Sequence, residues 1–344
     1  MFKRVAVVGA GSLGTIIGAR LNAAGIKADL VDSFQENVDA LNEHGATVTG
    51  NLDMKNIPVR AYTPQALEGI YDLILLVTKQ TANEEILRDL LPHLDDSSLV
   101  LTLQNGIPEY NVAKIVGEKR TAGGAVGWGA TWVKPGVSSY TSTMYLLENA
   151  AFDIGEMDGK ITERIQAAAG ILDHVGKTHV MDNLLGIRWA KLLMNATFSG
   201  MSAAMGSLFG DVLDDPFTLK CIAHIADETV RCSQACGIRM ALMQGDKDFE
   251  TLKLDPGQKE EDKFPLFHEV WDQHRLLKAS MLQDLEKGRP CEIDFINGVV
   301  CETGRQKGIP TPFNDMVVKL IKRQQQTGKL NTMADKAEFE PLFK

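Results

Sequence analysis

The stretch Arg4-Val5-Ala6-Val7-Val8-Gly9-Ala10-Gly11-Ser12-Leu13-Gly14, at the start of the chain, decides the fold. Its apolar run, residues 4–8, is short and bounded by glycine, which is typical of a strand buried on both faces. Apolar residues then recur at helical spacing from Ser12 to Ala24. Three glycines spaced as GxGxxG therefore stand where a buried strand turns into a helix.

An acidic residue completes this pattern. The next expected strand, Ala28 to Val31, ends at Asp32. In such a βαβ unit the first glycine permits a tight turn, the second lets a pyrophosphate approach the backbone, and the third lets the helix pack closely. The helix N-terminus offers unpaired N–H groups to the phosphates. We predict a dinucleotide site made of Gly9, Ala10, Gly11, Ser12, Leu13 and Gly14, with Asp32.

Asp32 bears on the choice of cofactor. A carboxylate at this position accepts hydrogen bonds from the adenosine ribose and repels a 2′-phosphate, which favours NAD(H) over NADP(H). The following Ser33, Phe34 and Gln35 supply no cation that would neutralise such a phosphate. The alternative interpretation is that Asp32 only caps the next helix.

The pattern divides the chain into two domains. Strands expected at Leu73–Val77 and Ser98–Leu103 alternate with helices, which indicates an α/β, Rossmann-type domain with a parallel sheet over residues 1–182. From Leu184 onward the periodicity is helical, so residues 183–344 are expected to form an all-helical domain. Its expected helices are Leu184–Ala204, Phe217–Cys236, Phe267–Leu285 and Pro312–Gln325. The polar tail after them has Phe339, Leu342 and Phe343 as candidate docking residues.

Composition argues against several classes of protein. The net charge of -9 disfavours nucleic acid as a partner. The five cysteines include no CxxC pair and the seven histidines no HxH or HExxH spacing, so we expect no metal site. We also expect no membrane span, because long uncharged apolar stretches are absent. The first residues run directly into a strand, so a cytoplasmic protein is expected.

Further motifs carry a resemblance to a known family. They are Val77-Thr78-Lys79, Leu103-Gln104-Asn105-Gly106, Lys191-Leu192-Leu193-Met194-Asn195, Ser280 to Asp284, and Glu292-Ile293-Asp294-Phe295-Ile296-Asn297-Gly298. In this order and spacing the chain, to about Pro312, resembles the ketopantoate reductase (2-dehydropantoate 2-reductase) family. The resemblance implies reduction of a small 2-keto acid to the 2-hydroxy acid with a nicotinamide cofactor, for which the family's usual choice is NADP(H).

Chemistry and resemblance together suggest catalytic residues. Hydride addition to a ketone leaves an alkoxide, so a proton donor must stand beside the carbonyl oxygen. Lys191, Asn195 and Ser199 follow one another at i, i+4 and i+8, so one helix would point all three the same way. The resemblance implies that Lys191 is the general acid and that Glu292 accepts a substrate hydroxyl and pairs with Lys191. The alternatives are a surface lysine and a carboxylate at a helix start.

The resemblance also implies substrate-binding residues. Lys79 and Asn105 end adjacent strands at the carboxyl edge of the sheet, where ligands bind in open α/β folds. Asn105 would lie near the nicotinamide and the carbonyl, and Lys79 would meet cofactor or substrate; a turn-forming Asn-Gly is the alternative for Asn105. Ser280 would bind the substrate carboxylate or simply be packed. The expected substrate set is Asn105, Asn195, Ser199 and Ser280.

The chain departs from the family pattern at three places. Asp32 stands where the family usually has a cation, Ser199 where it has a second asparagine, and the charged segment Gly245 to Lys263 has no counterpart in compact members. Alternative functions are a 3-hydroxyacyl, opine or 6-phosphogluconate type dehydrogenase, or a non-catalytic dinucleotide sensor. A homodimer is the assembly expected if the chain associates.

Overall fold

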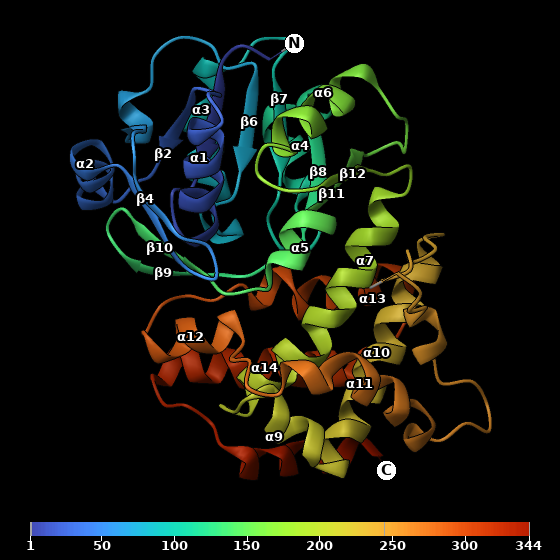
Figure 1. Ribbon diagram of the computed structural model, residues 1–344. Coiled ribbons are helices and arrows are strands. Elements are labelled where there is room, and N and C mark those ends of the chain that lie inside the picture. The colour runs from blue at the N-terminus through green and yellow to red at the C-terminus, as the bar shows by residue number, and fades with distance from the viewer. Residues whose placement is uncertain (1, 244, 344) are drawn as a thin grey trace. The chain divides into compact units, whose positions relative to one another are not determined.

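The computed structural model describes residues 2–243 and 245–343. The chain forms two units, Met1–Leu184 and Leu185–Lys344. The first is an α/β unit of Rossmann type and the second is helical, as the sequence predicts (Figure 1). Within the described residues no helix is both long and apolar enough to cross a membrane.

The first unit is built on a mostly parallel sheet that has eight strands in the described part of the chain. β1 (Val5–Val8) is an interior strand, paired in parallel with β2 (Ala28–Val31) and β6 (Leu73–Leu76). β11 (Phe152–Glu156) is antiparallel to β8 (Thr121–Val126). The order is β12 (Thr178–Val180), β11 (Phe152–Glu156), β8 (Thr121–Val126), β7 (Leu99–Thr102), β6 (Leu73–Leu76), β1, β2 (Ala28–Val31) and β5 (Arg60–Tyr62).

Helices cover both faces of this sheet. Alternate residues of β1 belong to two separate apolar clusters, Val5 and Val7 to one and Ala6 and Val8 to the other. The first cluster includes side chains of α1 (Ser12–Ala23) and α6 (Glu163–Leu172). The second includes side chains of α3 (Asn83–Leu90) and α4 (Glu109–Val116). Burial on both faces explains why β1 is a continuous apolar run.

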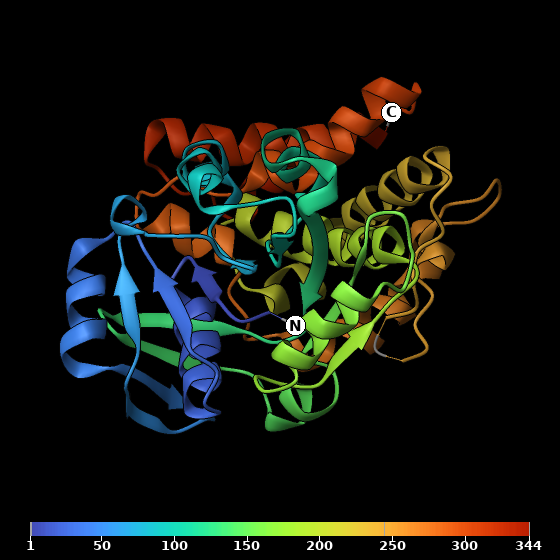
Figure 2. The same cartoon turned by 90° about the horizontal axis from the view of Figure 1, so that it is seen from above.

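A smaller sheet lies beside α1. It runs in the order β4 (Met54–Ile57), β3 (Ala46–Gly50), β10 (Val137–Tyr140) and β9 (Ala130–Lys134). Figure 2 shows the green strands β9 and β10 among the blue elements, because β10 pairs in parallel with β3 from much earlier in the chain. Two further helices, α2 (Gln35–His44) and α5 (Met144–Asn149), complete the unit.

The second unit consists of helices around α10. They are α7 (Leu184–Met194), α8 (Gly200–Ala204), α9 (Phe209–Asp214), α10 (Pro216–Ala235), α11 (Phe264–Trp271), α12 (Ser280–Glu286), α13 (Asn297–Lys307) and α14 (Pro312–Thr327). Two 3-10 turns, Phe249–Leu252 and Glu260–Lys263, interrupt the charged segment between α10 and α11. Phe249 and Leu252 are fully buried, so this charged segment is anchored to the helical unit.

The helix expected over Leu184–Ala204 is interrupted. Residues Asn195–Ser199 form a π-turn between α7 and α8, closed by the N–H of Gly200, which donates to the carbonyl of Asn195. A π-turn spans one residue more than an α-turn, so the stripe expected from i to i+8 does not pass through it unchanged. The single regular helix expected over Leu184–Ala204 is thus replaced by α7, a π-turn and α8, and Ser199 is the last residue of that turn.

The helix expected over Phe267–Leu285 is also divided, into α11 and α12. The carbonyls of Arg275 and Leu277 accept hydrogen bonds from Gly210 (2.8 Å) and Phe209 (3.2 Å) at the start of α9. Because these carbonyls pair with another helix, they are not available for a continuous helix through residues 275–279. Ser280 consequently begins a helix of its own.

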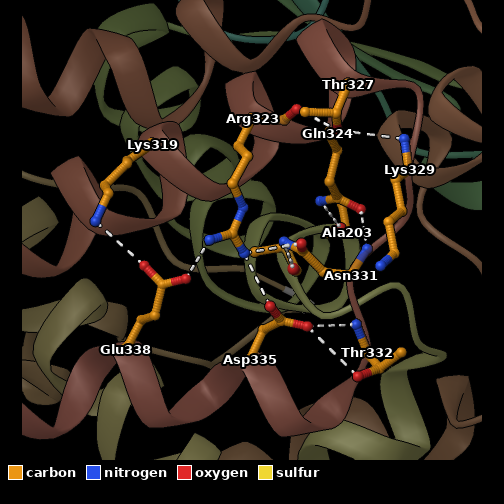
Figure 3. A network of polar contacts seen from close by, with 11 residues as sticks. Ala203, Lys319, Arg323, Gln324, Thr327, Lys329, Asn331, Thr332, Asp335 and Glu338 are labelled. Carbon is orange, nitrogen blue, oxygen red and sulfur yellow. Dashed lines mark hydrogen bonds and ion pairs between the residues drawn. The ribbon is translucent and has the colours of Figure 1, made fainter.

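The C-terminal tail docks on α14 through a polar network, shown in Figure 3. Arg323 is paired with Glu338 and donates to Asp335 and Asn331, both at 2.9 Å. Gln324 donates to the carbonyl of Ala203 at 3.0 Å and accepts from the N–H of Asn331 at 2.9 Å. Phe339 is fully buried and Phe343 contacts the ring of Phe313, so the docking expected of these two aromatic residues is confirmed.

A buried carboxylate closes the start of α14. Glu228 on α10 accepts hydrogen bonds from the backbone N–H groups of Phe313 and Asn314, both at 2.9 Å, and from the Asn314 side chain at 2.7 Å. Burial raises the pKa of Glu228 to about 7, and the nearby Asp315 acts in the same direction. The neighbouring thiols, Cys232 and Cys301, are buried too, which raises their own pKa values.

This shift predicts a pH dependence of stability. Between about pH 4.5 and pH 7 the folded chain holds a proton on Glu228 that the unfolded chain releases, so this contribution to stability is complete below pH 4.5 and lost as pH rises through 7. The test is urea unfolding of the wild type and of Glu228→Gln at several pH values. As pH rises from about 4.5 to about 7, the free energy of unfolding of the wild type should fall relative to that of Glu228→Gln. Glu302→Gln, on the exposed face of α13, is the control and should show no such difference. A wild-type and Glu228→Gln difference that is constant with pH would contradict the shift.

Candidate dinucleotide and keto-acid sites

The glycine-rich turn has the shape that a bound pyrophosphate needs. Gly9 has a φ of 103°, and a side chain at Gly14 would place its Cβ 2.0 Å from the Gly9 carbonyl oxygen. Both positions therefore require glycine. At Gly11, in contrast, an added Cβ would meet nothing within 4 Å. The open space lies at the second glycine, where phosphate would approach the backbone.

The start of α1 is prepared for an anion. Among the described residues no side chain caps its N-terminus at Gly11. The preceding turn is fixed independently, because Gly9 and Ala10 donate to the carbonyl of Val31 at 2.8 and 3.1 Å. The first-turn N–H groups and the helix dipole are thus left to a ligand, and the residues present fit a dinucleotide pyrophosphate.

Asp32 lies directly after β2, beside this turn. Its carboxylate accepts hydrogen bonds from the Phe34 N–H at 2.9 Å and from the Asn37 side chain at 3.1 Å. Burial raises its pKa, and these hydrogen bonds act in the opposite direction. The N-cap position of α2 is Phe34, so Asp32 stabilises the turn before the helix without being its N-cap. Each carboxylate oxygen keeps a further lone pair for a ribose hydroxyl.

Lys79 and Asn105 follow β6 and β7 at the carboxyl edge of the sheet, as expected. The two loops are joined by Gln104, which is buried and donates to the Thr78 carbonyl at 2.8 Å and to the Asn83 side chain at 2.6 Å. Gln80 donates to the backbone carbonyl of Asn105 at 2.6 Å. This bonding holds the backbone of Asn105 and leaves its half-buried side chain for other contacts.

The candidate residues of the second unit lie on neighbouring segments. Lys191 is half-buried in α7, and Asn195 begins the π-turn one helical turn later. The side-chain nitrogen of Asn195 is buried, and no hydrogen-bond acceptor contacts it among the described residues. A buried donor without an acceptor is costly, so a ligand oxygen would be well bound there.

Glu292 precedes a 3-10 turn, Ile293–Phe295, and is largely buried. Its backbone carbonyl accepts from Phe295 at 2.9 Å, and the preceding Cys291 donates from its N–H to Gln325 on α14 at 3.0 Å. Ser280 is exposed at the first position of α12, which packs against α8. The structure thus places the segments that carry Asn195, Ser280 and Glu292 around α8 and α14.

Two residues that hold these sites, Asn37 and Gln104, were not predicted from the sequence. Asn37 is fully buried and bridges three segments, donating to the Ala10 carbonyl at 2.9 Å and to Asp32 while accepting from the N–H of Gly136 at 2.8 Å. Gln104 stood inside a quoted motif without a role. The sequence gives one hint of their roles: each is an amide side chain at a position where the pattern is otherwise apolar or a turn. Within the described residues no group of three or more potential metal ligands occurs.

A glycine turn that fits a pyrophosphate on a Rossmann-type unit, followed by a helical unit, defines the class of two-domain nicotinamide-dinucleotide oxidoreductases. Comparison with known families shows which family of this class the chain belongs to. Residues 5–159 match the model described as ketopantoate reductase PanE/ApbA, and residues 183–325 match the ketopantoate reductase PanE/ApbA C-terminal model. The chain belongs to the ketopantoate reductase PanE/ApbA family, whose members are NAD(P)-dependent 2-keto acid reductases.

Individual relatives agree with this assignment. The chain is 26% identical over 328 residues to a 2-dehydropantoate 2-reductase of Pyrococcus horikoshii, covering 94% of this chain and 98% of the relative. It is 28% identical over 323 residues to the protein of the same name from Pyrococcus abyssi, covering 94% and 98%.

Solved structures agree as well. A 2-dehydropantoate 2-reductase from Geobacter metallireducens has a TM-score of 0.79 at 26% identity, covering 93% of this chain and 99% of the other. D-mandelate dehydrogenase in a ternary structure with NADH and anilino(oxo)acetate has a TM-score of 0.80 at 22% identity, covering 94% and 99%, and this likeness shows the fold.

The glycine geometry predicts different effects for two similar substitutions. Gly14→Ala should destabilise the chain by about 1–3 kcal/mol, because its methyl group would press on the Gly9 carbonyl. Gly11→Ala should unfold like the wild type in urea and yet bind the dinucleotide at least about tenfold more weakly, because its methyl group enters the open space. Fluorescence titration with the reduced cofactor measures the affinity. Wild-type affinity in Gly11→Ala would show that the pyrophosphate lies elsewhere.

Proposed function

We propose that the chain reduces the keto group of a small 2-keto acid, ketopantoate or a related compound, with NADH. The proposal rests on the buried amide nitrogen of Asn195, one helical turn after Lys191, which has no acceptor within residues 2–243 and 245–343. A donor in that position suits the oxygen of a carboxylate or carbonyl. In this proposal residues 1–182 bind the dinucleotide and residues 183–344 supply the substrate-binding and catalytic side chains.

The proposed reaction needs one proton donor on the protein. When bound, the dinucleotide supplies a hydride to the carbonyl carbon. Lys191 transfers a proton from its ammonium group to the carbonyl oxygen, so that the product leaves as a neutral alcohol, and it regains a proton from solvent. Before the transfer, its positive charge stabilises the negative charge that develops on the oxygen.

The other proposed site residues orient the substrate. Glu292 accepts a hydrogen bond from a substrate hydroxyl and pairs with Lys191. Asn105 and Asn195 donate to substrate oxygens, and Ser199 and Ser280 bind the polar groups that remain. Gly9 to Gly14 bind the pyrophosphate, Asp32 the ribose, and Lys79 contacts the cofactor.

The experiment that tests the proposed function is a screen of 2-keto acids with NADH and with NADPH, followed by the loss of cofactor absorbance. We expect turnover with branched, hydroxylated 2-keto acids of ketopantoate size. Absence of turnover with any 2-keto acid, together with tight dinucleotide binding, would instead favour a non-catalytic sensor.

A second candidate substrate is a bulkier, aryl-bearing 2-keto acid. Ser199 is smaller than the asparagine usual in the family, and a smaller side chain there would admit a larger substrate group. The similar D-mandelate dehydrogenase was crystallised with NADH and anilino(oxo)acetate, an oxo acid with an aromatic group. Phenylglyoxylate in the same screen distinguishes the two substrates. A part in pantothenate synthesis follows only if ketopantoate is preferred; the cytoplasmic location and homodimer expected from the sequence remain predictions.

Lys191→Ala should lower kcat by about 10²–10⁴-fold, because the alkoxide would lose its proton donor. Its dinucleotide affinity should stay unchanged, since the phosphate-binding turn belongs to the other unit. Lys220→Ala, on α10 and ion-paired with Glu261, removes a lysine of the same unit and should keep wild-type kcat. Turnover of Lys191→Ala within a few fold of wild type would mean that the proton comes from another group.

Asp32 is expected to make NADH the better cofactor. The double substitution Asp32→Ala with Ser33→Arg should shift the ratio of kcat/KM values toward NADPH by about 1–3 kcal/mol, because it removes a repulsive charge and adds a phosphate partner. Steady-state kinetics with both cofactors measure the ratio. Ser33→Arg alone separates the added attraction from the lost repulsion. Equal or better use of NADPH by the wild type would refute the role given to Asp32.

A further inference from the structure

The π-turn Asn195–Ser199 takes from the Ala196 carbonyl its α-helical partner, because the N–H of Gly200 donates to Asn195 instead. The Thr197 hydroxyl shares its one proton between the carbonyls of Leu193 at 2.7 Å and Met194 at 3.1 Å, in the last turn of α7. The carbonyl of Ala196 instead accepts a hydrogen bond from the Asn297 side chain on α13, at 3.0 Å. The Ala196 carbonyl of the π-turn is thus paired by a side chain 101 positions away in the sequence.

Asn297 is itself held on both sides. Its side-chain nitrogen also donates to the Asn314 side-chain oxygen at 2.9 Å, and Asn314 donates to the Glu228 carboxylate at 2.7 Å. Asn297 and Asn314 are fully buried, and Glu228 is largely so. This buried row of hydrogen bonds pairs the amide donors of Asn297 and Asn314 in one arrangement, and it therefore holds the two side chains rigidly.

A glycine makes room for this contact. Gly200, whose N–H closes the π-turn, lies so near Asn297 that an added Cβ would be 2.7 Å from the Asn297 side-chain oxygen. The π-turn and the Asn297 side chain are therefore fitted to each other. Asn195, the residue before Ala196, carries the buried amide nitrogen that has no acceptor in the described chain.

We propose that Asn297 is a positioning residue for the keto acid: by holding the Ala196 carbonyl it fixes the π-turn and thereby the direction of the Asn195 side chain. This inference rests on the proposed function. Asn297 touches no substrate in this account; it acts through Asn195. Its loss leaves the Ala196 carbonyl and the Asn314 oxygen unpaired and allows the turn to relax toward regular helix, which rotates Asn195.

The direct test is Asn297→Ala, compared with Gln324→Ala. Gln324 is an equally buried amide that donates to a backbone carbonyl, Ala203, at 3.0 Å, but it lies beyond the π-turn on the side of the tail (Figure 3). We expect both variants to lose thermal stability. Only Asn297→Ala should raise the KM for the 2-keto acid, by about tenfold or more, with unchanged dinucleotide affinity. A KM within about twofold of wild type in Asn297→Ala would overturn the proposal.

A second variant guards against loss of folding. Gly200→Ala keeps every amide and adds a good helix former, but its methyl group must displace the Asn297 side chain. We expect a loss of thermal stability no larger than that of Asn297→Ala, with the same rise in KM. Wild-type KM in a folded Gly200→Ala would count against the proposal.

Backbone hydrogen exchange separates this inference from the proposed function. Protection of the amides of residues 195–200 should fall in Asn297→Ala and persist in Gln324→Ala, whatever the enzyme reduces. If the wild type turns over no 2-keto acid, the proposed function fails while the exchange result still decides whether Asn297 fixes the turn. Unchanged protection in Asn297→Ala would overturn the positioning role by itself.

Discussion

The pairing of buried backbone polar groups is the constraint on which this structure depends. Where a helix or strand ends or is interrupted inside the protein, a side-chain amide or carboxylate from another segment hydrogen-bonds to the backbone N–H or carbonyl that would otherwise lack a partner. Gln104 does this for the Thr78 carbonyl, Glu228 for the start of α14, and Asn297 for the π-turn. The start of α1 differs: among the described residues it has no side-chain cap, and its second glycine faces open space. The N–H groups at the start of α1 therefore stay available where we propose that the pyrophosphate binds.

Much of the fold could be predicted from local pattern. The strand before Gly9, the three glycines and the acidic residue after the second strand form a short-range signature, because each residue acts on neighbours within one βαβ unit. The division into an α/β and a helical part followed from the change in hydrophobic period near Leu184, since period depends only on nearby residues. The positions of Lys79 and Asn105 at strand ends followed from the same pattern.

What could not be predicted depends on partners far away in the chain. The π-turn depends on Asn297, which pairs with its Ala196 carbonyl, and the periodicity of residues 184–204 gives no sign of it. The break between α11 and α12 depends on α9, which binds the carbonyls of Arg275 and Leu277. Asn37 connects the glycine turn to Gly136, some hundred residues later. Helical spacing is reliable until a tertiary contact offers the backbone a better partner, and the regular helix expected over Leu184–Ala204 was wrong for that reason.

The central claim is that a hydride passes from the nicotinamide to a 2-keto acid on this chain. The most direct test is to supply reduced dinucleotide deuterated at the transferable position of its nicotinamide ring, and to analyse the 2-hydroxy acid by mass spectrometry. The account predicts one deuterium on the carbinol carbon of each product molecule, formed in step with oxidised cofactor. Cofactor that binds and yet transfers no label to any 2-keto acid would contradict it.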